Sequence, residues 1–138
     1  MASDSRIDSA LNLLRLTLGG TAFVAGADKF TDFLADWEAY LSPVARRNLP
    51  MSPRNFMRSV GVIEMAVGAL ILGRQTRLGG YVARAWLLGI AANLVSSGKY
   101  FDIAARDVNM AVAALVLARL SEARTSSQVE TTPIRRAA

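Results

Sequence analysis

Four long stretches of the chain are apolar with few charged interruptions, at about residues 10–27, 56–73, 79–97 and 103–120. Each has roughly the number of residues that an α-helix needs to cross the hydrocarbon core of a bilayer, because a helix rises about 1.5 Å per residue. The connections between the last three stretches are short, which is typical of antiparallel neighbours. The pattern predicts an all-α protein, a transmembrane four-helix bundle with up-down-up-down topology, in one domain over residues 1–120. A helix buried in a soluble bundle remains the alternative for the first stretch.

The segment after the first stretch has a different pattern. Over residues 30–41, apolar and aromatic positions recur at helical spacing while the acids Asp32, Asp36 and Glu38 face away. This pattern predicts an amphipathic helix that lies in the membrane interface. Ser42-Pro43 is expected to end this helix and to begin an irregular connection. Ser52-Pro53, a capping hydroxyl followed by a proline, then predicts the start of the second long helix.

The ends of the other helices also carry recognisable signals. Ser5 and Asp8 resemble a capping box before the first helix. Gly98 is expected to end the third helix, and Asp102 to cap the fourth. From residue 121 to 138 the chain is rich in Ser, Thr, Gln, Glu and Arg. That composition predicts a disordered polar tail.

Small residues are frequent on the predicted helices. Gly19 and Gly26 lie seven positions apart on one stripe, and Ala22 with Gly26 forms a small-xxx-small pair. Ala85 with Gly89 and Ala114 with Ala118 repeat the pattern on the third and fourth helices. Such residues let helix backbones approach closely in lipid, where no hydrophobic effect drives helices together.

Composition narrows the possible functions. Of 138 residues, 52% are hydrophobic and 20% are charged, and the formal net charge is +5. The basic residues are spread between hydrophobic blocks instead of forming one basic surface, so we expect lipids and membrane subunits as partners and no nucleic acid. The chain has no Cys and no His. Thiol chemistry, imidazole bases and the usual zinc, haem and iron–sulfur ligands are therefore excluded, and no metal site is predicted.

Glu64 is the most unusual residue, because it is an acid in the middle of an apolar helix. A charge at membrane depth is costly and normally has a partner. Counting residues from the helix ends places Lys29, Asn93, Arg106 and Asp107 at about the same depth as Glu64, whereas Arg15 and Arg84 fall nearer the other surface. Glu64 and the four residues at its depth form a candidate buried polar cluster: Lys29, Glu64, Asn93, Arg106 and Asp107. In this cluster Glu64 is expected to pair with Arg106 or Lys29. The cluster could bind a quinone head group or relay a proton, or it could be a structural network that fixes helix packing.

Several of these positions resemble the signatures of a known family. Arg15 to Gly19 with Phe23, Gly26 and Lys29 is similar to the first helix of DoxX-like membrane proteins. Gly61, Glu64, Gly68 and Gly73 with Arg77 resemble the second helix, and Arg106-Asp107 followed by alanine-rich turns resembles the last. The resemblance implies a small four-helix inner-membrane protein near quinone-linked electron transfer, with Lys29, Glu64, Arg106 and Asp107 at polar signature positions. The founding members are associated with a thiosulfate:quinone oxidoreductase.

Three functions follow from this reading. The first is an accessory multi-pass subunit that packs against larger partners in a membrane redox or energy-converting complex, without catalysis of its own. The second is a quinone-interacting subunit of a DoxX-type oxidoreductase that uses the Glu64 cluster. The third, a small-solute or proton carrier, is weaker, since the chain has no inverted repeat. No cofactor is predicted, and contact with a quinone or lipid stays open. We expect an inner membrane of the bacterial type with both termini in the cytoplasm, because the turn from Arg74 to Arg77 is basic.

Overall fold

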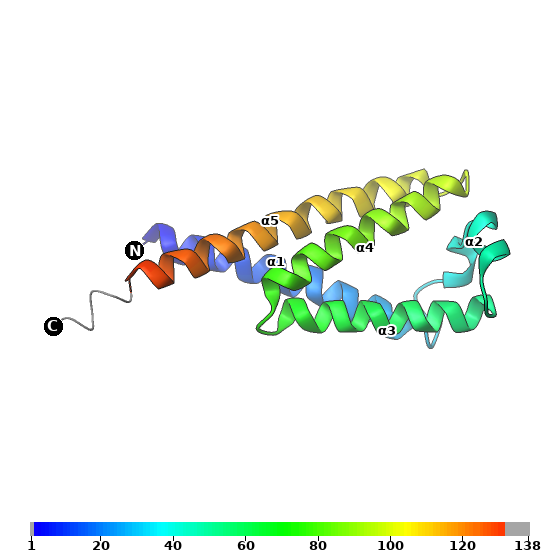
Figure 1. Cartoon of the computed structure of the whole chain (residues 1–138), viewed down its shortest axis with the longest axis horizontal. Coiled ribbons are helices and arrows are strands. Elements are labelled where there is room, and N and C mark those ends of the chain that lie inside the picture. The colour runs from blue at the N-terminus through cyan, green and yellow to red at the C-terminus, as the bar shows by residue number, and fades with distance from the viewer. Residues whose placement is uncertain (1, 132–138) are drawn as a thin grey trace.

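The computed structural model describes residues 2–131, which contain four long helices and two short helical elements between the first two long ones (Figure 1). In chain order the elements are α1 (Ala2–Asp28), the 3₁₀ helix η1 (Trp37–Tyr40), α2 (Pro43–Asn48), α3 (Pro53–Leu72), α4 (Thr76–Ser96) and α5 (Phe101–Thr131). No strand occurs in the described part of the chain. The all-α prediction is therefore confirmed.

The long helices form two closely packed pairs, α1 with α3 and α4 with α5. The two pairs also touch each other through α3 with α4 and through α1 with α5. Figure 1 shows the start of α1 and the end of α5 projecting together past the turn between α3 and α4, while η1 and α2 lie at the opposite end of the molecule. Both ends of the described chain thus lie at the same end of the molecule.

Two glycine pairs fix how closely α1 and α3 approach. A Cβ atom added at Gly61 would lie 2.5 Å from the carbonyl oxygen of Gly26, and one added at Gly68 would lie 2.7 Å from that of Gly19. These distances are too short for any side chain, and the obstacle is backbone that cannot move aside. The seven-residue spacing on both helices therefore places two backbone contacts along one antiparallel interface.

The second pair has a similar contact. A Cβ atom on Gly80 would lie 2.9 Å from the carbonyl oxygen of Ala114 and 3.0 Å from the Cβ of Ala118. The main apolar core cluster lies where the two pairs meet and contains six buried side chains, namely Leu18, Val67, Ile71, Ala83, Ala114 and Leu117. A smaller cluster of Ala91, Leu94 and Ala104 lies between α4 and α5. Ile71, Ala114 and Leu117 are fully buried.

The predicted interfacial helix over residues 30–41 is wrong. The chain turns after Asp28, Asp32 has a left-handed backbone with φ of 52°, and only Trp37–Tyr40 is helical, as a single 3₁₀ turn. Asp28 causes the break, because its carboxylate accepts hydrogen bonds from the backbone N–H groups of Phe33 and Leu34 at 3.0 and 2.9 Å. A carboxylate that binds loop amides favours a turn over a helix.

Ser42-Pro43 begins a helix, whereas the sequence pattern predicts that it ends one. The Ser42 hydroxyl accepts a hydrogen bond from the backbone N–H of Ala45, and Pro43 occupies the first turn of α2. Ser52 and Pro53 repeat the arrangement at α3, where Ser52 accepts from the Asn55 N–H. The predicted start of α3 is confirmed, and the irregular connection before it contains α2.

The ends of the outer helices differ from the prediction as well. α1 already runs from Ala2, so Ser5 and Asp8 lie within the helix and do not cap it. Asp102 lies in the first turn of α5, where an acid stabilises the helix dipole. Gly98 does leave α4 with a positive φ of 69°.

α5 continues to Thr131, so residues 121–131 are helical where the composition predicts disorder. The hydroxyls in this part bond back to the preceding turn, as Ser121 does to the Leu117 carbonyl at 2.9 Å. Arg124 pairs with Asp4 at 3.3 Å and with Asp8 at 2.6 Å on α1. Tertiary ion pairs therefore hold a segment whose composition alone does not favour a helix. Residues 132–138 of the predicted tail lie outside the described residues.

Three helices are long and apolar enough to cross a membrane: Asp4–Asp28, Pro53–Leu72 and Thr76–Ser96. Large apolar side chains are exposed on their outer faces, among them Leu13, Leu16, Val62 and Val95. Only 17 to 33% of each candidate span is buried inside the molecule, so most of its surface faces outward. In a bilayer those faces contact lipid tails.

Candidate functional site

The centre of the candidate site is an ion pair between α3 and the end of α1. The Lys29 ammonium group donates to the Glu64 carboxylate, with 2.5 Å between Nζ and Oε2. Lys29 is 4% exposed and Glu64 is 7% exposed. Gly61 lies one turn before Glu64, and its contact with Gly26 brings the two helix backbones together at this level. The close packing of α1 and α3 therefore positions the pair.

Two tryptophans complete the surroundings of the pair. The Lys29 Nζ lies 3.7 Å from the centroid of the Trp37 ring, a cation–π contact that also covers the ammonium group. The Trp86 indole N–H, from α4, donates to Glu64 Oε1 over a long 3.5 Å. Both partners of the ion pair thus have an aromatic neighbour that the sequence pattern did not identify.

Asp28 holds Trp37 in place. Its Oδ2 accepts from the Trp37 indole N–H at 2.8 Å, and its Oδ1 accepts from the Thr31 hydroxyl at 2.8 Å. The carboxylate therefore binds four donors in total, counting the backbone amides of Phe33 and Leu34. Asp28 and Lys29 are adjacent in sequence, so one turn of chain both supplies the cation and fixes the ring that covers it.

Asp107 and Arg106 pair with each other instead of with Lys29 or Glu64. Arg106 contacts Asp107 at 3.1 Å, while its own side chain is 64% exposed. Asp107 is buried. Glu64 is paired with Lys29, and Arg106 binds its neighbour on α5.

Asn93 bonds to the backbone of the η1–α2 segment and not to the Lys29–Glu64 pair. Its amide N–H donates to the Tyr40 carbonyl at 2.8 Å, and its oxygen accepts from the Ser42 N–H at 3.1 Å. Tyr40 in turn packs edge-on against Tyr100, with 4.9 Å between ring centroids. Asn93 therefore ties the η1–α2 segment to α4, away from Glu64.

Sequence reasoning missed Asp28, Trp37 and Trp86. Asp28 could have been noticed, because it is an acid directly adjacent in sequence to Lys29, a predicted site residue. The tryptophans gave no signal, because an aromatic residue on an apolar helix is ordinary core or interface material. Their roles depend on the turn after α1 and on the packing of α4.

The Lys29–Glu64 pair supports few kinds of chemistry. An ammonium paired with a carboxylate can hold helices in register or exchange a proton, but it offers no nucleophile activated by a base. No group of three or more His, Cys, Asp or Glu side chains that could hold a metal ion occurs among the side chains described, those of residues 4–127. Two hollows lie near the beginning of α1, and neither is lined by Glu64 or Lys29.

Apolar helices with lipid-facing surfaces and one internally neutralised ion pair define a multi-pass integral membrane protein. A comparison with protein families matches DoxX over residues 10–96, which is more than half of the chain. The chain belongs to the DoxX family. No curated protein and no solved structure matches it.

Proposed function

We propose that the protein is an accessory subunit with four membrane-spanning helices that packs against larger subunits of a redox or energy-converting complex. The observation that carries this proposal is the closed Lys29–Glu64 pair, whose two charges satisfy each other inside the chain. A buried pair of this kind favours a structural role, because each charge is already neutralised by the other.

A stripe of small residues on the outer face of α4 supports docking. Ala85, Gly89, Ala92 and Ser96 follow the spacing of one helix face, and all four are exposed. A Cβ atom on Gly89 would meet nothing within 4 Å, so no packing inside the molecule explains the small residue. A partner helix could approach closely along this stripe.

The fourth crossing is part of the proposal. α5 has Arg106, Asp107 and Arg119 in its apolar part, and it is not among the three helices that meet the length and hydropathy requirement. However, Val108, Val112 and Val116 form an exposed stripe at four-residue spacing, as expected for a lipid-facing helix. With four crossings both termini share one side, for which we propose the cytoplasmic side of a bacterial-type inner membrane.

Purification from native membranes in mild detergent tests this function. We expect the tagged protein to co-purify in fixed stoichiometry with larger membrane subunits. Gly89→Leu is expected to abolish that association and to leave the melting temperature of the isolated protein unchanged. Val95→Leu, an equally exposed position on α4, is the matched control.

The alternative is a quinone-interacting subunit that uses Glu64. Its support is the long 3.5 Å contact between Trp86 and Glu64 Oε1, which leaves that oxygen able to accept a stronger hydrogen bond. Under the accessory function, Glu64→Gln leaves the quinone reduction rate per assembled complex unchanged. A rate that collapses while the complex still assembles would favour the quinone function instead.

A further inference from the structure

Arg15 is a cation within the apolar part of α1 that has no carboxylate partner among the described residues. Its Nε donates to the Ile71 carbonyl at 3.3 Å, and its Nη2 donates to the carbonyls of Leu72 and Gly73 at 2.8 and 2.9 Å. Arg15 thereby caps the last turn of α3. The end of a helix carries roughly half a negative charge, so a substantial positive charge remains.

A hollow opens beside this guanidinium group. Its volume is about 260 Å³, and it is lined by Asn12, Arg15, Leu16 and Leu72. A water molecule takes up about 30 Å³ of liquid, so the space accommodates a phosphate group. Arg15 Nη1 donates to Asn12 at a long 3.4 Å. That nitrogen still has a second N–H to offer, since a guanidinium group carries five in all.

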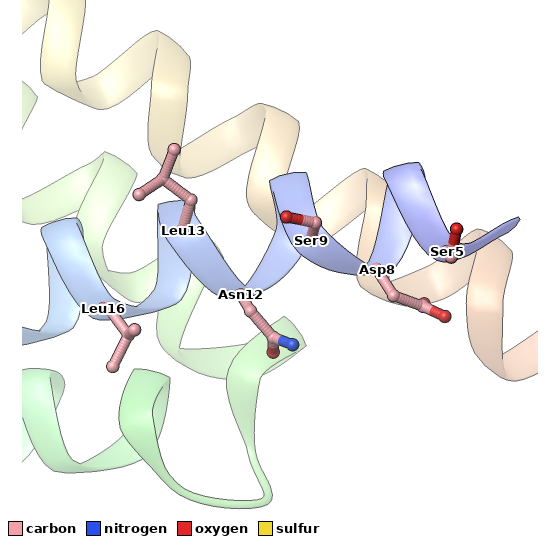
Figure 2. A pocket seen from close by; sticks show the side chains of 6 residues that line it. All are labelled: Ser5, Asp8, Ser9, Asn12, Leu13 and Leu16. Carbon is pink, nitrogen blue, oxygen red and sulfur yellow. The ribbon is translucent and has the colours of Figure 1, made fainter. Parts of the chain in front are cut away.

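A wider hollow of about 610 Å³, shallow and largely open, continues along α1 and is lined by residues of that helix alone. Figure 2 shows its lining, in which Asn12 and Leu16 point toward the turn between α3 and α4, with Ser5, Asp8 and Ser9 nearer the start of the helix. Ser5, Asp8 and Ser9 therefore lie toward the start of α1, Asn12 follows, and Leu16 lies one turn deeper than Asn12. This order matches a phospholipid, whose polar head group lies above its acyl chains.

The charges at this end favour an anionic lipid. Each described acid here already has an arginine partner: Asp4 and Asp8 bind Arg124, and Glu122 binds Arg77 and Arg119. Arg6, Arg15 and Arg74 remain without a carboxylate partner in residues 4–127. Asp8 lines the wider hollow, where its ion pair with Arg124 offsets part of the repulsion that a phosphate would meet.

We propose that Arg15 and Asn12 form a binding site for the phosphate of an anionic phospholipid, with an acyl chain along Leu16, which lines both hollows. The guanidinium group and the Asn12 amide hold the phosphate oxygens, and charge-assisted hydrogen bonds of this kind are among the strongest in proteins. The site needs only the membrane location of the family. It does not depend on which complex the protein joins.

The test uses the purified full-length protein in neutral detergent, with bound lipids counted by native mass spectrometry and thermal stability measured during lipid titration. Phosphatidylglycerol is compared with phosphatidylcholine of the same chain length and with glycerol phosphate, which has no acyl chains. We expect only phosphatidylglycerol to bind with saturation and to raise the melting temperature. Equal effects of phosphatidylcholine, or of glycerol phosphate, would overturn the proposal.

Variants locate the site. Arg15→Gln is expected to weaken phosphatidylglycerol binding about tenfold or more, the loss expected for a hydrogen bond to a charged group. Because this change also removes the cap of α3, Asn12→Leu provides a second test that leaves Arg15 and its cap intact. Arg84→Gln, an exposed arginine in α4, is the charge-matched control and should bind as the wild type does. If Asn12→Leu binds like the wild type, or if Arg84→Gln loses as much as Arg15→Gln, the site is not at Arg15.

Discussion

At the scale of single residues, the Lys29–Glu64 pair decides the stability of the α1–α3 interface. Both groups are buried, and removal of either leaves an uncompensated charge in an apolar environment. We expect Lys29→Met to cost about 3 kcal/mol or more, which corresponds to a fall of roughly 10 °C in melting temperature. The measurement is thermal unfolding in detergent.

The double variant Lys29→Met/Glu64→Gln is the informative control for this prediction. It removes both charges together, so we expect it to recover most of the stability that the single variant loses. A double variant as unstable as the sum of the single ones would show that the two residues act independently, against the pairing described here.

Asp28 offers a second prediction at this scale. Its carboxylate accepts four hydrogen bonds that shape the turn after α1. An Asn side chain at this position has only one acceptor oxygen, so it can accept only part of these bonds. Asp28→Asn is expected to speed hydrogen exchange at Phe33 and Leu34 and to free the Trp37 ring. Asp36→Asn, at a position with no side-chain cap bond, is the control and should leave exchange in the turn unaltered.

At the scale of the helices, glycines set the distance between α1 and α3. We expect Gly26→Ala to destabilise the protein by about 1 to 3 kcal/mol, because the new Cβ atom would lie 2.6 Å from the Gly61 carbonyl oxygen. Gly20→Ala is its control on the same helix, since its Cβ would meet nothing within 4 Å. Thermal unfolding of both variants checks the prediction, which fails if they melt at the same temperature.

The helices also show where sequence patterns were informative. The positions of the four long helices followed from their apolar length, and Ser52-Pro53 gave the start of α3. The predicted helix over residues 30–41 was wrong. Its apolar residues have helical spacing, but Asp28 binds backbone amides of this segment and stabilises a turn instead. The helical end of α5 was missed for a similar reason, since its partners Asp4 and Asp8 are remote in sequence.

At the scale of the whole molecule, the number of crossings can be measured directly. The chain has no cysteine, so single cysteines can be introduced without background labelling. With four crossings, Gln75→Cys and Ser126→Cys should react with an impermeant maleimide from one side of the membrane, and Phe33→Cys and Lys99→Cys from the other. Labelling of positions 99 and 126 from the same side would mean that α5 does not cross. Permeabilised membranes, in which all four positions react, provide the control.

The candidate site illustrates how far a sequence can lead. Glu64 was identifiable because an acid in an apolar helix is costly, and Lys29 was one of two predicted partners because helix rise places both at one depth. Helix rise does not give rotation about the axis, so it could not decide between Lys29 and Arg106. Rotation depends on the glycine contacts of α1 with α3 and on the packing of α4 against α5.

The sequence by itself determined the all-α fold, the membrane character and the absence of thiol and imidazole side chains. These properties depend on composition and on periodicity along one helix, which are local. Only the tertiary structure decided that Lys29 neutralises Glu64, that Asn93 holds the η1–α2 segment and that Arg15 caps α3 beside a hollow. Each of these contacts joins residues far apart in the chain, and their geometry depends on how closely the helix backbones approach.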